Sequence, residues 1–448
     1  MTYSQKETIA AIATPPGDGG VAIVRISGDQ AIDIVEKVYS GQIRSYQSHH
    51  ARCGKIIDLA GTLVDEVLVL VMLAPRSYTG ETTVEIHCHG GHLITQKVLA
   101  TLLDAGARPA LPGEFTYRAF MNGKLDLAQA EAVQTLIGSK NDLSAQTASK
   151  QLQGRLSQAV QEFKNKLIDI AATLEAWVDF PEEDLEFSSM EDLIRSLRQV
   201  REKIHGLYTT FHRGRIIHQG ISITLSGRPN VGKSSLMNAL LGKDQAIVTD
   251  IPGTTRDLLE ADLRLGSLHV RLIDTAGIRD TDEPVETEGI RRAEAAMQEA
   301  DLVLLVLDAS APLADDPLLS ATDPKRTLVV WNKTDLTTTP PPCDHYIPLS
   351  VKQQTGFDLL YQKIDELIFG KDMPNNDEII ITQERHHHAL KEAIQSLDQV
   401  IAGLQSGVSP EFLASDMRTT LQALGKIIGS DLSEDILNAI FSKFCIGK

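Results

Sequence analysis

The chain has 448 residues, 42% of them hydrophobic and 23% charged, which is the balance of a globular protein large enough for several domains. Its formal net charge is −17, from 60 Asp and Glu against 43 Lys and Arg, and no segment is basic. Because neutralising nucleic-acid phosphates requires clustered Lys and Arg, this charge argues against tight nucleic-acid binding by the chain alone.

Nothing in the chain predicts export or a membrane. The N-terminal residues hold no basic start followed by an apolar core, so we expect no secretory signal. No apolar run approaches the roughly 20 residues that span a bilayer. The cysteines Cys53, Cys88, Cys343 and Cys445 are scattered without a CxxC pair. Reduced thiols fit this spacing better than a disulfide framework, so we expect a cytoplasmic protein.

Residues 1–119 are predicted to form an α+β domain. Its expected strands are 21–27, 66–73 and 83–89, and its expected helices are 29–39 and 92–105. His87, Cys88, His89 and His92 could form a metal site. Alternation along a strand, however, places His87 and His89 on one face and Cys88 on the other, so a packed strand end is the favoured interpretation.

Residues 120–214 are predicted to be the first part of a helical domain. Apolar residues spaced by threes and fours from Leu152 to Trp177 predict one long amphipathic helix, and the same spacing from Leu193 to Phe211 predicts a second. Residues 377–448 are the expected second part, with helices at 384–405, 410–428 and 433–444. Each presents an unpartnered apolar stripe, so we expect the two parts to pack as one discontinuous bundle.

Residues 215–376 alternate strands and helices as a parallel-sheet α/β domain does, inserted within the bundle. The expected strands are 221–226, 269–273, 302–308, 327–331 and 346–349, and the expected helices are 234–242, 287–300 and 355–369. Further along, the run His386-His387-His388 lies on successive faces of a helix, and we expect it at the solvated surface.

A phosphate-binding P-loop is predicted at ISITLSGRPNVGKSS, residues 221–235. A β-branched strand leads into a loop with four residues between Gly227 and Gly232, and a helix follows. The glycines let backbone N–H groups converge on an anion, and the helix N-terminus adds partial positive charge. Lys233 is expected to reach the terminal phosphates, and Ser234 to ligate magnesium.

Further motifs follow in the order that a GTPase requires. DIPGTTRD at 250–257 offers threonine hydroxyls to magnesium, with Thr255 as the expected ligand, and DTAG at 274–277 ends a strand. In NKTD at 332–335, Asp335 can accept from the N1–H and 2-amino groups of guanine, a donor pair that adenine lacks. The expected GTP-binding residues are Asn230, Val231, Gly232, Lys233, Ser234, Ser235, Thr249, Asp250, Ile251, Pro252, Gly253, Thr254, Thr255, Asp274, Thr275, Ala276, Gly277, Asn332, Lys333, Asp335, Ser350, Val351 and Lys352.

The residue after DTAG is Ile278, which cannot orient an attacking water. Glu286, in the acidic segment that follows, is our candidate for this catalytic role. The loop also lacks an evident arginine finger, and a monovalent cation near the β- and γ-phosphates could supply the missing charge. Asn230 offers such an ion a carbonyl, or it only shapes the loop.

Along essentially its whole length the chain resembles the MnmE (TrmE) family of bacterial tRNA-modification GTPases. The shared blocks are residues 8–28, 77–91, 112–133, 227–240 and 247–257 and the terminal FCIGK. The resemblance implies an α/β plus all-α fold: an α+β folate-binding domain that dimerises, a discontinuous helical bundle, and an inserted Ras-like P-loop domain with a mostly parallel sheet. It also implies a potassium-dependent GTPase that is activated when two such domains meet.

The resemblance implies site residues as well. Asn230, with backbone carbonyls of Thr249, Ile251 and Thr254, matches the family's potassium loop, and Glu286 falls at its catalytic glutamate. A tetrahydrofolate one-carbon donor, 5-formyl or 5,10-methylene, is expected near Arg25, Glu85, Lys124 and Lys448. A carboxylate suits the donors of the pterin ring, and cations suit the folate's glutamate tail. Cys445 is a candidate nucleophile or a packing residue.

The family reaction modifies the wobble uridine of tRNA at C5, adding a carboxymethylaminomethyl group. The family acts with an FAD-dependent partner, MnmG (GidA), so the resemblance implies a homodimer within a heterotetramer or larger complex, away from membranes. We expect weak tRNA binding by this acidic chain alone. The alternative is a regulatory GTPase switch of the ribosome-assembly type, which would need neither the N-terminal domain nor the terminal CIGK.

Overall fold

The computed structural model describes residues 3, 7–179, 190–243, 260–265, 268–274, 300–311, 323–337, 346–370, 378–430 and 432–448. The chain divides into two compact units. One comprises Met1–Ile137, Ser149–Glu202 and Ala389–Lys448, and the other Gly138–Ala148 and Lys203–His388. None of the described helices is both long and apolar enough to cross a membrane.

The first unit begins with a six-stranded sheet of order β3-β4-β5-β2-β1-β6, in which only β6 runs parallel to its neighbour. Its strands are β1 (Ile9–Ile12), β2 (Gly19–Ser27), β3 (Ala51–Ile57), β4 (Leu63–Met72), β5 (Thr83–Gly90) and β6 (Arg108–Pro109). The sequence predicted β2, β4 and β5. It missed β1 and β6, which are short, and β3, whose ARCGKII sequence is interrupted by Arg52, Gly54 and Lys55.

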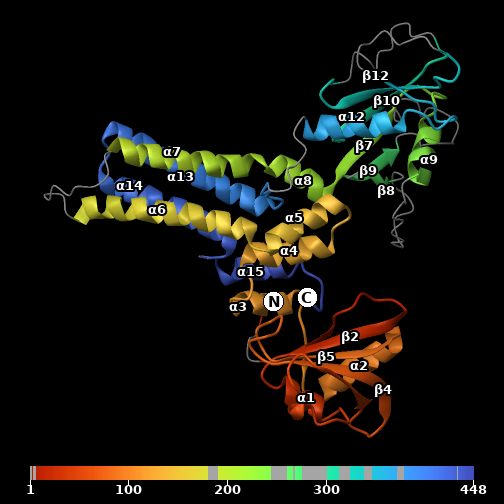
Figure 1. The fold of residues 1–448 in the computed structure, drawn as a ribbon, viewed down its shortest axis with the longest axis vertical. Coiled ribbons are helices and arrows are strands. Elements are labelled where there is room, and N and C mark those ends of the chain that lie inside the picture. The colour runs from red at the N-terminus through yellow and green to blue at the C-terminus, as the bar shows by residue number, and fades with distance from the viewer. Residues whose placement is uncertain are drawn as a thin grey trace, which may run out of the picture. The chain divides into compact units, whose positions relative to one another are not determined.

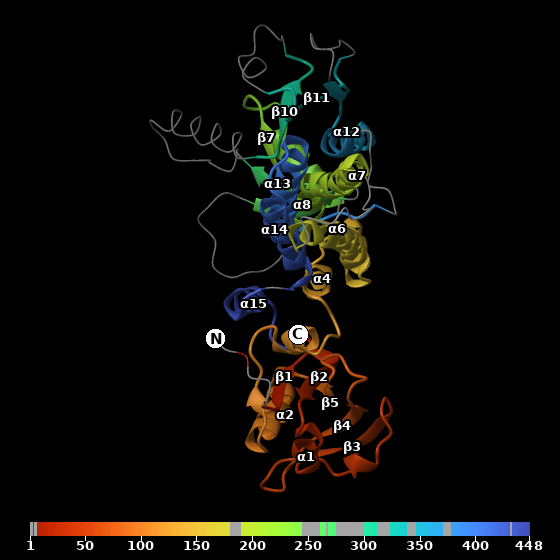
Figure 2. The ribbon, with the colours of Figure 1, turned by 90° about the vertical axis from the view of Figure 1, so that its left-hand side faces the viewer.

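One face of this sheet is covered by α1 (Ala31–Glu36) and α2 (His92–Asp104), as Figure 2 shows, and a short turn, η1 (Ile43–Ser45), follows α1. Val24 and Ile26 of β2 and Ile86 of β5 point into the core beneath these helices. Strand alternation therefore sends the residues between them, Arg25 and Glu85, to the opposite face. That is how the sheet presents the first pair of predicted site residues.

The pairing of α6 (Arg155–Asp179) with α14 (Pro410–Ile428), one helix from each predicted part, confirms the discontinuous bundle. The other helices that follow or precede the two sheets are α3 (Glu114–Met121), α4 (Leu127–Ile137), α5 (Asp142–Leu152), α7 (Met190–Thr209), α8 (Phe211–Gln219), α13 (Glu384–Ser406) and α15 (Glu434–Phe441). Although far apart in sequence, α6 and α14 run side by side (Figure 1). An ion pair of 3.0 Å between Arg418 and Glu175 joins them.

Two helical predictions were wrong in part. The pattern from Leu152 to Trp177 is not one helix, because Gly154 adopts φ 83° and separates α5 from α6. The histidine run is not all at the surface: His386 is fully buried, and only His388 is exposed. The His387 ring lies flat against Tyr208 and Phe211, with centroid distances of 4.4 and 4.3 Å.

The second unit contains a six-stranded sheet of order β12-β11-β10-β7-β9-β8, parallel except for β8. Its strands are β7 (Ile221–Ser226), β8 (Glu260–Leu265), β9 (Leu268–Asp274), β10 (Leu302–Asp308), β11 (Thr327–Asn332) and β12 (Tyr346–Pro348), and its described helices include α9 (Lys233–Lys243) and α12 (Phe357–Phe369). The predicted parallel strands are confirmed, and β8 was missed because EADLRL is half charged. The predicted helix at 287–300 lies almost wholly outside the described residues.

Residues 138–148 belong to this second unit although the chain on both sides belongs to the first. Asn141 donates from Nδ2 to the carbonyl oxygen of Ile217 over 3.0 Å, in a buried position. Lys140 forms a 2.8 Å ion pair with Asp262 on β8. These two contacts bind the residues just before α5 to the unit whose sheet carries the P-loop.

Candidate functional site

The P-loop joins the buried strand β7 to the start of α9, and its glycines are required by their surroundings. Gly227 has φ 142° and Gly232 has φ 102°, which favour glycine. A Cβ on Gly227 would lie 2.3 Å from the Val306 carbonyl oxygen, and one on Gly232 would lie 2.4 Å from Asn332 Nδ2. Lys233 Nζ donates to the carbonyls of Gly227 and Arg228 over 2.7 and 2.8 Å, which holds the ammonium group over the loop.

The loop after β11 is bonded directly to the P-loop. Asn332 donates from Nδ2 to the carbonyl of Val231 over 2.9 Å and is almost fully buried. Lys333 donates from Nζ to the carbonyl of Asn230 over 2.9 Å. Both Asn230 and Lys333 have φ 64°, so each turns sharply at this junction. The structure thus brings two separately predicted motifs into one site, because parallel strands end at a common edge.

Asp335 and Ser350, from the loops after β11 and β12, also meet. Ser350 is fully buried and donates from Oγ to Asp335 Oδ1 over 2.7 Å. Val351 N–H donates to Asn332 Oδ1 over 3.4 Å. The Asp335 carboxylate is therefore held in one orientation before any base arrives. Lys352 is exposed on the same loop.

Asp308 is a site residue that the sequence reasoning missed. It ends β10 and accepts from Lys333 Nζ over 2.6 Å and from Ser310 Oγ over 2.6 Å. Burial acts to raise the pKa of Asp308, but the hydrogen bonds from Lys333 and Ser310 outweigh it and hold the pKa below its usual range. Its position at the carboxyl end of a buried strand was the available signal.

The remaining predicted nucleotide residues are only partly described. Asp274 ends β9 and pairs in register with Leu225, beside the P-loop strand. Ser234 and Ser235 are exposed in the first turn of α9. Residues 249–255, 275–277 and Glu286 lie outside the described residues.

A second candidate site lies on the face of the first unit's sheet that is opposite α1 and α2. Arg25 and Glu85 sit opposite each other in register on β2 and β5. Glu85 Oε1 accepts from Arg25 Nε and Nη2 over 2.8 and 2.7 Å, and both side chains are about one-sixth exposed or less. The rings of Tyr78 and Phe115 lie 5.5 and 5.7 Å from the guanidinium carbon. Glu85 Oε2 faces His87 Nε2 at 3.5 Å.

The aromatic neighbour Tyr78 is partly buried on this face. Burial raises the pKa of Tyr78, although a hydrogen bond with Thr116 and the charge of Arg25 act to lower it. A charged pair flanked by two aromatic rings suits a planar, polar ligand that carries hydrogen-bond donors.

A largely buried ion network lies on the same face of the sheet, and Ser27 of β2 takes part in it. Arg118 is 1% exposed and donates to Glu81 over 3.0 Å and to Glu114 over 3.2 Å. Arg108 binds the same Glu114, and Ser27 Oγ donates to Glu81 over 2.8 Å. Removing one member would leave an uncompensated buried charge, which is strongly destabilising. Sequence reasoning missed this network, because its members come from four separate segments.

The two predicted lysines lie on different segments of the first unit. Lys124 is exposed, and its Nζ donates to the Pro75 carbonyl over 3.2 Å. Lys448 follows Gly447, whose Cβ would lie 2.2 Å from the carbonyl oxygen of Ile12 at the end of β1. The C-terminus is therefore seated on the strand that pairs with β2.

Cys445 and the histidine cluster, for which the sequence left alternatives open, differ in exposure. The Cys445 carbonyl accepts from Gly113 N–H over 3.2 Å, while its thiol-bearing side chain is exposed. Cys88 is buried and donates to the Ala22 carbonyl, whereas His89 is exposed and pairs with Asp65. Within the described part of the chain no three His, Cys, Asp or Glu residues gather as a metal site would require.

Comparisons with known proteins cover nearly the whole chain. The family model described as GTP-binding protein TrmE N-terminus matches residues 8–124, and that of the MnmE helical domain matches residues 127–445. A tRNA modification GTPase MnmE from Protochlamydia amoebophila is 58% identical over 100% of this chain and 98% of its own length. One from Syntrophotalea carbinolica is 46% identical over 99% of each.

Among solved structures, the G domain of the T. maritima FeoB iron transporter is 27% identical. It covers 33% of this chain and 98% of its own, with a TM-score of 0.26. The family assignment depends on the two family models and the full-length relatives.

Proposed function

The chain belongs to the MnmE family of tRNA modification GTPases, and from this premise we propose the reaction that it serves. It is a GTP hydrolase that acts in tRNA modification. The proposed activity is potassium-activated. Together with an FAD-dependent partner, MnmG, the chain installs a carboxymethylaminomethyl group at C5 of the wobble uridine, using a one-carbon unit from tetrahydrofolate.

The observation that carries the nucleotide part is the bonding among the loops after β7, β11 and β12. These bonds support a site in which backbone N–H groups and Lys233 would bind the phosphates, and the Asp335 carboxylate, held by Ser350, would bind guanine. Ser234, at the first turn of α9, and Thr255 would hold magnesium, which when bound neutralises phosphate charge. GTP and magnesium are accordingly the cofactors of this unit.

The observation that supports the folate part is the Arg25–Glu85 pair between two aromatic rings. Arg25 donates to one oxygen of the Glu85 carboxylate, Oε1, and so orients the carboxylate. The carboxylate can then accept from the 2-amino and N3–H groups of a pterin ring. Lys124 and Lys448 are the proposed partners of the folate's own carboxylates. A regulatory switch would have no use for such a pair.

We further propose a homodimer and a complex with MnmG. The net charge of −17 leaves phosphate contacts to the partner, so tRNA binding by the chain alone is weak. The proposed reaction uses both GTP and a one-carbon group from tetrahydrofolate. It therefore accounts for a nucleotide site and a folate site in one chain.

Potassium should raise the rate of GTP hydrolysis relative to sodium. Asn230 lies in the P-loop with φ 64°, and its backbone carbonyl accepts from Lys333. We propose its side-chain carbonyl as one ligand of the ion. We expect about tenfold faster turnover in potassium at equal ionic strength, a contribution of about 1.4 kcal/mol to the transition state. Turnover is measured by phosphate release. The Asn230→Ala variant should hydrolyse GTP at the same rate in potassium and in sodium. Equal rates in the two salts for the unaltered chain would contradict the potassium proposal.

Glu286→Ala should leave nucleotide affinity unchanged and lower hydrolysis. Because Ile278 cannot orient water, we assign that task to Glu286, and positioned groups of this kind contribute about 10²–10⁴-fold. Nucleotide affinity and single-turnover hydrolysis are measured in parallel, with Glu288→Ala as the neighbouring control. Hydrolysis that is equally fast in Glu286→Ala would refute the role.

A further inference from the structure

A groove of about 560 Å³ in the first unit contains Lys124, one of the proposed folate residues. It lies where the loop before α4, the start of α6 and the end of α14 come together. Besides Lys124, its polar lining includes Asp126, Gln129, Ser157, Gln158 and Ser430.

The groove is linked to the Arg25–Glu85 pair by one short segment. Tyr78, whose ring flanks Arg25, is two residues from Gly80. A Cβ on Gly80 would lie 3.3 Å from Lys124 Cγ, and the neighbouring Thr79 carbonyl accepts from Asn122 Nδ2 over 2.7 Å. The segment from Tyr78 to Gly80 therefore lies against both Arg25 and Lys124.

The groove's polar groups suit an anionic chain. Lys124 is exposed at its edge, and a second cation, Lys164, donates to Ser430 Oγ over 3.4 Å. Asp126 is engaged in capping α4, since its Oδ1 accepts from Gln129 N–H over 2.9 Å. Ser157 Oγ is buried and has no hydrogen-bond partner among the described residues.

We propose that this groove binds the γ-linked oligoglutamate tail of the folate. The inference rests on the proposed folate function and adds a second subsite to it. Each glutamate of such a tail carries one carboxylate and one amide, so it pairs with lysines and with the hydroxyl and amide side chains of the lining. The consequence is a preference for polyglutamylated over monoglutamylated folate.

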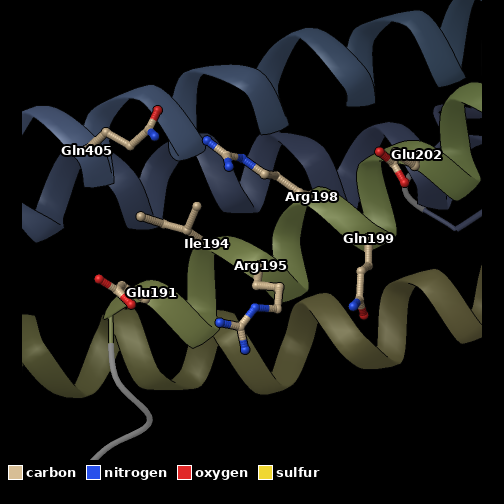
Figure 3. Close-up of a pocket in the computed structure, with 7 residues that line it drawn as sticks. All are labelled: Glu191, Ile194, Arg195, Arg198, Gln199, Glu202 and Gln405. Carbon is tan, nitrogen blue, oxygen red and sulfur yellow. The ribbon is translucent and has the colours of Figure 1, made fainter.

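A second groove, of about 410 Å³, does not offer the same chemistry. It runs along α7 and includes Gln405 of α13 (Figure 3). Arg195 and Arg198 reach to different sides of α7, and Glu191 and Glu202 flank them. Arg195 is also paired with Asp192 over 2.8 Å.

The test compares the affinities of 5-formyltetrahydrofolate monoglutamate and pentaglutamate for the full chain by titration calorimetry. We expect the pentaglutamate to bind about tenfold tighter, the factor that two or three partly exposed charge contacts supply together. The double change Gln158→Glu and Gln161→Glu, which adds negative charge to the groove, should bring this ratio close to one. Gln96→Glu, the same exchange on exposed α2, should leave the ratio unchanged.

Equal affinities of the unaltered chain for the two folates would overturn the tail subsite while leaving the folate site standing. A ratio that survives the double change would overturn it as well. Failure of the monoglutamate to bind at all would instead overturn the proposed folate function. Thermal unfolding of each variant shows that the chain remains folded.

Discussion

Asp335→Asn should lower the affinity for GTP about a hundredfold, or about 2.7 kcal/mol, and allow xanthosine triphosphate to bind in its place. The carboxylate accepts from two guanine donors, and an amide can accept at only one of its two positions. Xanthine carries an oxygen where guanine has its 2-amino group, so the new amide N–H gains an acceptor. Ser350 Oγ holds the side chain in place in either case. Titration of the unaltered chain and the variant with GTP and with xanthosine triphosphate measures the change in nucleotide preference.

A matched control for this change is Asp358→Asn, on the exposed first turn of α12. It removes the same charge from the same unit outside the nucleotide loops, and it should leave the preference for GTP intact. If Asp335→Asn kept the unaltered preference, the assignment of guanine recognition to this loop would be wrong.

Gly447→Ala should abolish most tRNA modification while GTP hydrolysis stays within about twofold of its normal rate. Gly447 has φ 88°, and an added Cβ would lie 2.2 Å from the Ile12 carbonyl oxygen. The backbone strain alone costs about 1–3 kcal/mol, and the clash adds to it. The C-terminal residues must then leave β1, and Lys448, a proposed folate residue, moves with them. Wobble nucleosides and GTP turnover are the two measurements.

Gly61→Ala separates the effect of backbone strain from the effect of displacing the C-terminal residues. Gly61 has φ 86°, nearly the same as Gly447, but no atom lies within 4 Å of the position of its Cβ. The Gly61→Ala variant should therefore lose stability through backbone strain without displacing the C-terminal residues, and tRNA modification should persist. Normal modification in Gly447→Ala would mean that the C-terminal seat has no part in the reaction.

The nucleotide site could be predicted from the sequence because its information is local. Each motif follows a strongly apolar strand, and parallel strands deliver their ends to one edge, so Asn332 and the P-loop had to be neighbours. Asp308 was missed because it belongs to no motif, although it ends a strand of the same sheet. The weakly patterned β8 was missed because edge strands need less apolar surface.

The second site could not be predicted from local pattern. Arg25 and Glu85 are ordinary strand residues until β2 and β5 pair in register, and only the family resemblance selected them. The supporting network of Arg118 joins segments separated by up to about a hundred residues, a distance that no short periodicity reports. The misjudged His387 shows the same limit, since helical position alone does not reveal the rings of Tyr208 and Phe211.

Wobble-nucleoside analysis of tRNA from cells lacking this chain tests the central claim most directly. The comparison includes cells complemented with the unaltered chain, with Glu85→Gln and with Lys233→Ala. We predict that carboxymethylaminomethyluridine disappears without the chain, returns with the unaltered chain, and stays absent with either variant. An unchanged set of wobble nucleosides in the cells lacking the chain would contradict the account.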